Sequence, residues 1–148
     1  MNQIKKILGL ILLVGVALYG YNENARYAPN PDNNRQTTTT QSLQYAYDNR
    51  LSDIQVSGSG TVLHLLADDN EGSRHQKFLL KISSTQTLLI SHNIDLAPRI
   101  DSLRKGDTLQ FFGEYEWNPK GGVVHWTHHD PNGRHIDGWL KHAGKTYQ

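Results

Sequence analysis

The sequence predicts a mainly β domain, and three observations indicate its architecture. From Ile54 onward, apolar residues recur at the two-residue spacing of strands, and turn-forming residues divide this stretch into five runs. Helix signals interrupt the pattern once, between the third and the fourth run. Three strands, a helix and two strands follow one another in this order in the OB-fold. We therefore expect a small five-stranded OB-like Greek-key barrel with a short helix between strands three and four.

Each expected strand is a run of alternating apolar residues bounded by turn signals. Gly58 and Gly60 interrupt the first run and favour a bend or a bulge there. The expected strands cover residues 56–67, 75–82, 87–92, 107–117 and 123–129.

Two short helices are expected, one on each side of the first three strands. Leu43, Tyr47 and Leu51 recur at four-residue spacing behind Ser42, a residue type that caps helices. The second helix is expected over residues 98–106, because proline suits a first helical turn and glycine suits a helix end. Its junction with the fourth strand resembles that of many OB-folds.

Residues 1–21 have the pattern of an export signal. Lys5 and Lys6 precede an apolar run that ends at Tyr19. The run is shorter than the roughly 20 residues that cross a bilayer, which favours a cleaved signal peptide. A weak cleavage site, and the interfacial position of Tyr19 and Tyr21, favour a retained membrane anchor instead. Under either alternative we expect an exported protein, periplasmic or anchored to the inner membrane and facing the periplasm.

The remaining chain divides into a linker and one domain. Residues 22–41 are rich in Asn, Pro, Thr and Gln, a composition typical of flexible tethers. Residues 42–148 are expected to form the barrel domain, since this length suits one hydrophobic core. If the anchor is retained, the inner membrane is an expected partner of the chain.

Composition excludes several kinds of chemistry. The 148-residue chain has no cysteine, so a disulfide framework, thiol catalysis and cysteine-ligated zinc are excluded. The formal charge of +1 becomes −1 if Lys5 and Lys6 are removed with a signal peptide. A nearly neutral domain lacks the positive charge typical of nonspecific nucleic-acid binding, although a local basic patch would still allow that partner.

Four of the eight histidines lie within eleven positions near the C-terminal end of the chain. Histidine is the commonest metal ligand, and its charge changes near neutral pH. We therefore weigh a site for a divalent metal such as zinc against the alternative of structural core and rim histidines. The candidate metal ligands are His125, His128, His129, Asp130 and His135, with Glu114 as the alternative carboxylate to Asp130.

Two Asx-Pro-x-Gly sequences, at residues 118–121 and 130–133, predict hairpin turns in this region. With one bulge in the first hairpin, Glu114 lies opposite Trp126. The second turn would return His135 to the vicinity of the preceding histidines, where cross-strand neighbours can share a ligand.

Alternation then separates two faces of the first hairpin. The more apolar face carries His125 and His129 and is expected to face the core. The second turn would place His135 beside His129, or beside His128 without a bulge. The other face is expected to point outward and carries Phe112, Glu114, Glu116, Val124, Trp126 and His128.

A second polar group, Arg74, His75, His92 and Asn93, lies at the ends of the second and third expected strands. Hydrolysis of a phosphoester would use a histidine as general base and Arg74 to stabilise the anionic transition state. In the alternative interpretation, Arg74 balances an acidic loop and Asn93 caps a turn. The candidate catalytic residues are His128, His135, Arg74 and His75.

Four motifs carry a resemblance: SRHQ at 73–76, HNIDLAP at 92–98, GEYEWN at 113–118 and HWTHHDP at 125–131. With them, the segment from about residue 60 to 147 resembles a family of small bacterial proteins classed only as a domain of unknown function. The resemblance implies a bacterial exported or membrane-tethered protein and supplies no activity.

Three functions remain open at this point, and the sequence does not decide whether the protein is an enzyme. The first is an exported OB-like domain that binds a small or oligomeric ligand at a surface lined by His, Trp and Glu. The second is a metal-dependent or histidine-based phosphoester hydrolase, and the third is a structural envelope protein. The candidate ligand-binding residues are Trp126, Glu114, His92 and Asn93.

Overall fold

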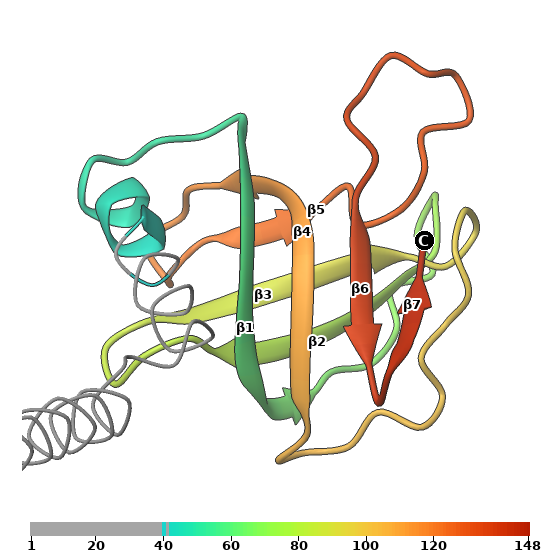
Figure 1. The fold of residues 1–148 in the computed structure, drawn as a ribbon, viewed down its shortest axis with the longest axis horizontal. Helices are drawn as coiled ribbons and strands as arrows, with labels where there is room; N and C mark the ends of the chain where they lie inside the picture. Colours follow the sequence, from blue (N-terminus) through green and yellow to red (C-terminus); the bar gives the residue numbers. More distant parts are fainter. Residues whose placement is uncertain (1–39, 41) are drawn as a thin grey trace, which may run out of the picture. The chain divides into compact units, whose positions relative to one another are not determined.

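The computed structural model describes residue 40 and residues 42–148 (Figure 1). The export segment expected over 1–21 lies outside the described residues, as does nearly all of the expected linker. Within the described part of the chain, no helix is long and apolar enough to cross a membrane.

Five strands close into a barrel, and two further strands extend it (Figure 1). Around the barrel, β1 pairs with β2, β2 with β3, β3 with β5, β5 with β4, and β4 again with β1. Only β3 and β5 run parallel among these pairs. The expected OB-like Greek-key barrel is therefore confirmed. The strands are β1 Ile54–Leu65, β2 His75–Lys81, β3 Thr87–Asn93, β4 Thr108–Glu116, β5 Val123–His125, β6 Trp139–His142 and β7 Lys145–Tyr147.

The fifth expected strand, 123–129, is shorter than predicted. β5 ends at His125 because Trp126 adopts a φ of 50°, which leaves the strand conformation. β6 then pairs with the first half of β4, along the part of the same edge that β5 leaves uncovered. Neither β6 nor β7 was expected, since runs of four and three residues are too short to display a strand period.

The helix expected over 98–106 is absent, and the chain there forms turns. The side chain of Gln76 takes the place of helical hydrogen bonds. Its Nε2 donates to Ile100 O at 3.0 Å, and its Oε1 accepts from Ile100 N at 2.9 Å. Ile100 and Leu103 are still buried, as expected, because the turns direct them inward.

The short helix before β1 spans residues 42–48. Leu43 and Ala46 on this helix are fully buried, and the Gln86 amide donates to Leu43 O at 3.2 Å. Ser42 was expected to stand before the helix as its cap, but Ser42 is itself helical. The core continues through the barrel with Val56, Val62, Phe78, Leu80, Ile82, Leu88, Ile90, Leu109, Phe111, Tyr115, Val124, Leu140 and Tyr147.

Candidate functional site

The pairing of β4 with β5 decides which side chains meet. Glu114 lies opposite His125, one position away from the predicted pairing with Trp126. The turn at 118–121 forms as expected, with Gly121 N donating to Asn118 O at 3.2 Å. The difference arises at the end of the turn, where Gly121 and Gly122 both adopt positive φ values, 116° and 98°.

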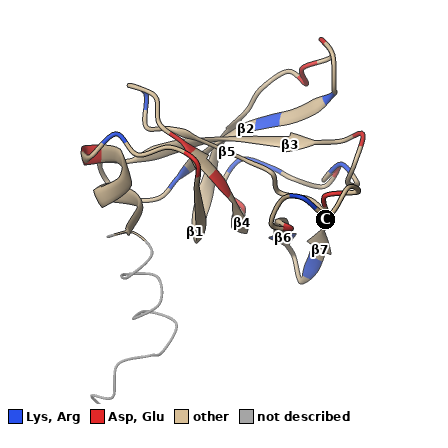
Figure 2. Ribbon diagram, turned by 90° about the horizontal axis from the view of Figure 1, so that it is seen from above, with Lys and Arg blue, Asp and Glu red and all other residues tan. Residues whose placement is uncertain are grey.

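This one-residue difference exchanges the faces on β5. Val124 is buried opposite Tyr115, whereas His125 points outward beside Glu114 and Glu116. The expectation that His125 faces the core is therefore wrong. Figure 2 shows the acidic positions of β4 in red on the ribbon.

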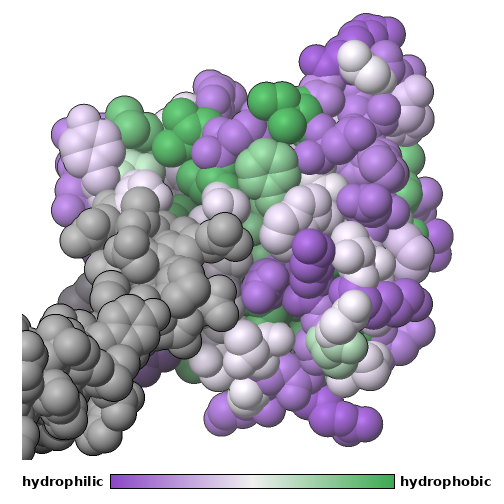
Figure 3. Space-filling view, viewed as in Figure 1, coloured by the Kyte–Doolittle hydropathy of each residue, from purple (hydrophilic) through white to green (hydrophobic). Residues whose placement is uncertain are grey.

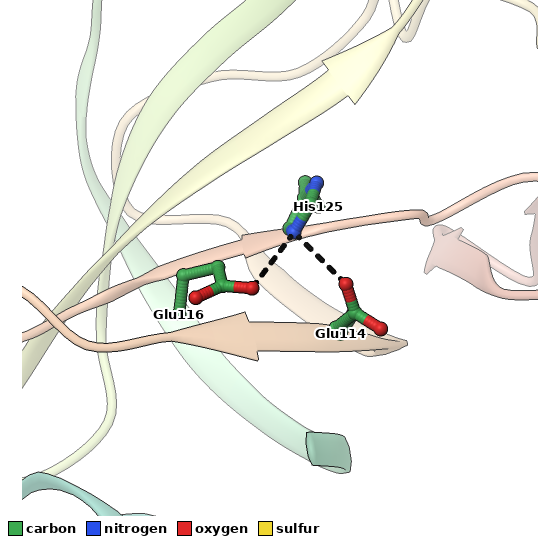
Figure 4. Close-up of side chains that lie close together, drawn as sticks. All are labelled: Glu114, Glu116 and His125. Atoms are coloured by element: carbon green, nitrogen blue, oxygen red, sulfur yellow. Dashed lines mark ion pairs between the residues drawn. The ribbon is translucent and has the colours of Figure 1, made fainter. Parts of the chain in front are cut away.

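Glu114, Glu116 and His125 form a compact group, which we call the Glu–His cluster (Figure 4). His125 Nε2 lies 3.4 Å from Glu114 Oε1 and 3.8 Å from Glu116 Oε1. One ligand atom from each of the three residues lies within 4.8 Å of the others. Among the described residues, this is the one group of three His, Asp or Glu side chains with that spacing.

Two buried atoms near Glu114 have no hydrogen-bond partner among the described residues. His125 Nε2 is at ion-pair distance from both carboxylates, yet neither contact has hydrogen-bond geometry. Gln55 lies opposite Glu114 on β1, and its Oε1 is also buried and unpartnered. Because buried polar atoms are normally satisfied, both call for a physical explanation.

The loop over 126–138 projects from the barrel between β5 and β6 (Figure 1). It returns His135 to the cluster, where His135 Nε2 donates to Glu114 Oε2 at 2.7 Å. The imidazole also stacks on the Trp126 ring, with 4.0 Å between centroids and 9° between planes. In Figure 3 the part of the surface formed by this loop is mainly hydrophilic.

Both ring nitrogens of His135 face acceptor oxygens, since Nδ1 lies 2.8 Å from Ile136 O. Only the doubly protonated ring can donate to both. Burial lowers the pKa of His135, but the hydrogen bond to Glu114, the bond to Ile136 O and the charges of Glu114 and Asp130 outweigh burial, so the net shift is upward.

Two aspartates hold the loop in shape. Asp130 accepts backbone hydrogen bonds from Asn132, Arg134 and His135 at 2.6–3.0 Å, and the first two lower its pKa most. Asp137 accepts from Asp130 N at 2.8 Å. The turn at 130–133 is present, but the strands of a hairpin do not follow it.

Comparison with known protein families identifies the chain. The family described as "Protein of unknown function (DUF3465)" matches residues 32–148. The chain belongs to the DUF3465 family. This confirms the resemblance to a domain of unknown function. No curated protein matches the chain.

In this DUF3465 chain, His128 and His129 do not join the Glu–His cluster. His128 is buried and donates from Nδ1 to His129 O at 2.7 Å. His129 also lies outside the Glu–His cluster, with its Nδ1 at 2.8 Å from Asp137 Oδ2. The contacts described for His135 are with Trp126, Glu114 and the loop backbone, and none of them is with the ring of His128 or His129.

His92 is a fully buried structural group. Its Nε2 donates to Pro98 O at 3.2 Å, which leaves Nδ1 to accept from the Thr127 hydroxyl at 2.8 Å. Burial lowers the pKa of His92 to about 4, because the charged ring would be desolvated there. A bound ligand therefore has no free ring nitrogen of His92 to contact.

The other polar group on β2 and β3 is occupied by its own contacts. Arg74 pairs with Asp95, Nε to Oδ1, at 2.7 Å. His75 Nδ1 lies 2.7 Å from Ser73 O, and Asn93 Oδ1 accepts from Asp95 N at 2.9 Å. None of these described contacts joins Arg74 or His75 to the Glu–His cluster, so they lend no support to a hydrolase.

Of the candidate metal ligands, His125 and the alternative carboxylate Glu114 belong to the Glu–His cluster. Asp130 and His135 support the loop beside it. Glu116 was expected on the outward face but not as a ligand. The alternation of Glu114, Tyr115 and Glu116 along one strand placed both carboxylates on one face, but the predicted register put His125 on the other.

Proposed function

We propose that this DUF3465 domain is a binding module whose ligand contacts the outer face of β4 and β5 beside the 126–138 loop. One observation carries the proposal: Glu114 has an imidazole from a different element at each of its two oxygens. His135 is held by the loop, and His125 by β5. Such convergence of polar groups from separate elements is typical of binding sites.

The charge of this surface indicates the kind of ligand. Glu114 and Glu116 offer carboxylate oxygens, which accept hydrogen bonds and attract positive charge. The expected ligand is therefore a small cation, or a small molecule that presents ammonium or hydroxyl groups. A bare phosphate group is disfavoured, because two carboxylates would repel it.

Stacking of a base or a sugar ring on Trp126 is a smaller part of this proposal. One face of the indole is already covered by His135 at 4.0 Å, and His128 lies against it at 5.2 Å. A stacked ligand would have to displace an imidazole that is itself hydrogen-bonded to Glu114.

The proposal can be tested on the full chain by two-dimensional amide NMR. Putrescine and glucosamine supply the expected donor groups, and inorganic phosphate is the contrasting probe. We expect a cationic probe, organic or metallic, to shift the amide signals of Glu114, Glu116 and His125, and phosphate to leave them unchanged. Glu114→Gln should weaken the response, while Glu71→Gln in an exposed loop should not. If putrescine, glucosamine and divalent metal ions all leave these signals unmoved, the proposal is wrong.

A further inference from the structure

We propose that Glu114, Glu116 and His125 are the protein ligands of a divalent transition-metal ion, with Zn²⁺ the preferred one. This inference rests on the proposed function, because it names the ligand class of the same surface. The three side chains come from two adjacent strands of a closed barrel, so the backbone already holds them together. A site on paired strands is more rigid than one on loops.

The separations fit an ion of this size. Zinc binds imidazole nitrogen and carboxylate oxygen at about 2.0–2.2 Å, so two ligands of a tetrahedral ion lie about 3.4 Å apart. His125 Nε2 and Glu114 Oε1 are separated by 3.4 Å, and His125 Nε2 and Glu116 Oε1 by 3.8 Å. An ion between them therefore needs only a small side-chain rotation.

The unpartnered nitrogen of His125 is the second, independent observation. Nε2 is buried against the two carboxylates and makes no hydrogen bond within the described structure. A metal ion would satisfy this lone pair, and its positive charge would offset the repulsion between the two carboxylates. Gln55 Oε1, buried on the other side of Glu114, is a further oxygen without a partner there.

His135 acts as a positioning residue for the ligand Glu114. It binds Oε2 at 2.7 Å and so leaves Oε1 directed at His125. Carboxylates that bind metals are commonly oriented by such an outer hydrogen bond. His135 is in turn fixed by Asp130, which accepts its backbone N–H at 2.9 Å, and by the Trp126 ring.

The ligand types select the metal class. One imidazole and two carboxylates suit borderline ions such as Zn²⁺, whereas Mg²⁺ and Ca²⁺ prefer oxygen ligands alone. Affinity for such sites rises from Mn²⁺ to Cu²⁺ and falls again at Zn²⁺, which still binds more tightly than Mn²⁺. Three protein ligands leave at least one coordination position for water or for a ligand from solution.

The test uses the full untagged chain, stripped with a chelator and titrated calorimetrically with Zn²⁺, Mn²⁺ or Mg²⁺. We expect one Zn²⁺ per chain, weaker binding of Mn²⁺ and none of Mg²⁺ at the same concentration. Nitrogen NMR of the imidazoles should show the His125 Nε2 signal moving on Zn²⁺ addition, a change that a purely structural role would not produce.

Substitutions distinguish the residues that bind the metal from residues that do not. His125→Ala and the isosteric Glu116→Gln should each weaken Zn²⁺ binding by about tenfold or more, and His135→Ala by about tenfold, as for outer-sphere partners. His64→Ala, an exposed histidine of β1, is the matched control and should bind as the unsubstituted chain does.

Two outcomes overturn the inference. One is the absence of Zn²⁺ heat and of any His125 shift, and the other is equal affinity of the His125→Ala and His64→Ala chains. If Zn²⁺ does not bind but putrescine or glucosamine shifts the Glu114 signal, only the metal inference is wrong. If neither the metal ions nor putrescine nor glucosamine binds at this surface, the proposed function is wrong as well.

Discussion

His135 Nε2 donates a hydrogen bond of 2.7 Å to Glu114 Oε2, joining the 126–138 loop to the barrel wall. The two side chains are 19% and 16% exposed, so the pair is partly shielded from water. Through this contact the loop determines how Glu114 presents its other oxygen to His125. The loop and the Glu–His cluster are therefore coupled, and a substitution in either should change the structure or stability of the other.

A double-mutant cycle should measure that coupling. We expect Glu114→Gln and His135→Ala to show a coupling free energy of about 1 kcal/mol, since the bond is charge-assisted but partly exposed. Urea unfolding of the two single variants and the double variant provides the measurement. Effects on the free energy of unfolding that simply add would show that the contact is not formed in solution.

Asp130 should control the order of the loop. Its carboxylate accepts the N–H groups of Asn132, Arg134 and His135. Asp130→Ala removes these acceptors, so we expect amide hydrogen exchange at Arg134 and His135 to accelerate by about tenfold or more. Asp101→Ala, in an exposed turn, is the control, and equal exchange rates in both variants would contradict the role assigned to Asp130.

His92 should make stability depend on pH. Its pKa is lowered from 6.5 to about 4 by burial, so the unfolded chain binds a proton more readily than the folded one. Stability is therefore complete above pH 6.5 and falls as the pH drops from 6.5 to about 4. The loss is on the order of 3 kcal/mol.

The measurement compares urea unfolding across this pH range in the unsubstituted chain and in His92→Gln. The variant starts from lower stability, because it disturbs the bonds to Thr127 and Pro98, but its stability should change less with pH. His64→Gln should retain the full pH dependence. An identical pH slope in the His92→Gln chain would show that His92 does not cause it.

Gly113 allows β4 and β5 to approach closely beside the cluster. A Cβ at this position would overlap the His125 carbonyl oxygen and crowd Thr127 and Val124. We expect Gly113→Ala to destabilise the fold by about 2 kcal/mol or more and to shift the His125 amide signal. Gly144→Ala is the control, because a Cβ there would meet no atom and only the φ of 78° opposes it. This substitution should lower the free energy of unfolding by only about 1 kcal/mol. Equal destabilisation by the two substitutions would show that β4 and β5 leave room for a Cβ at position 113.

The barrel could be predicted because its longer strands carry their own pattern. β2 and β3 alternate strictly between buried and less buried positions, and turn residues bound them. The absent helix at 98–106 could not be predicted, because its helix signals are local. Gln76, far away in the chain, satisfies the backbone of Ile100 and removes the need for helical bonds.

The candidate site was predicted only in part. The histidine-rich segment and its outward neighbour Glu114 were recognised, and the structure joins the two through the hydrogen bond from His135 to Glu114. The partners of His125 were not recognised, because the predicted register turned its side chain into the core. The role of each of these residues stays a prediction until the variants are measured.

By itself, the sequence determined the strand alternation, the turn at 118–121, the OB-like order of the strands and the concentration of imidazoles near the C-terminal end. Only the tertiary structure decided which of these imidazoles meet Glu114. The physical reason is that side-chain direction reverses with every residue of a strand. The positive φ values of Gly121 and Gly122 shift the pairing by one residue, and that of Trp126 ends the strand, so together they direct His125 and His135 to the same carboxylate.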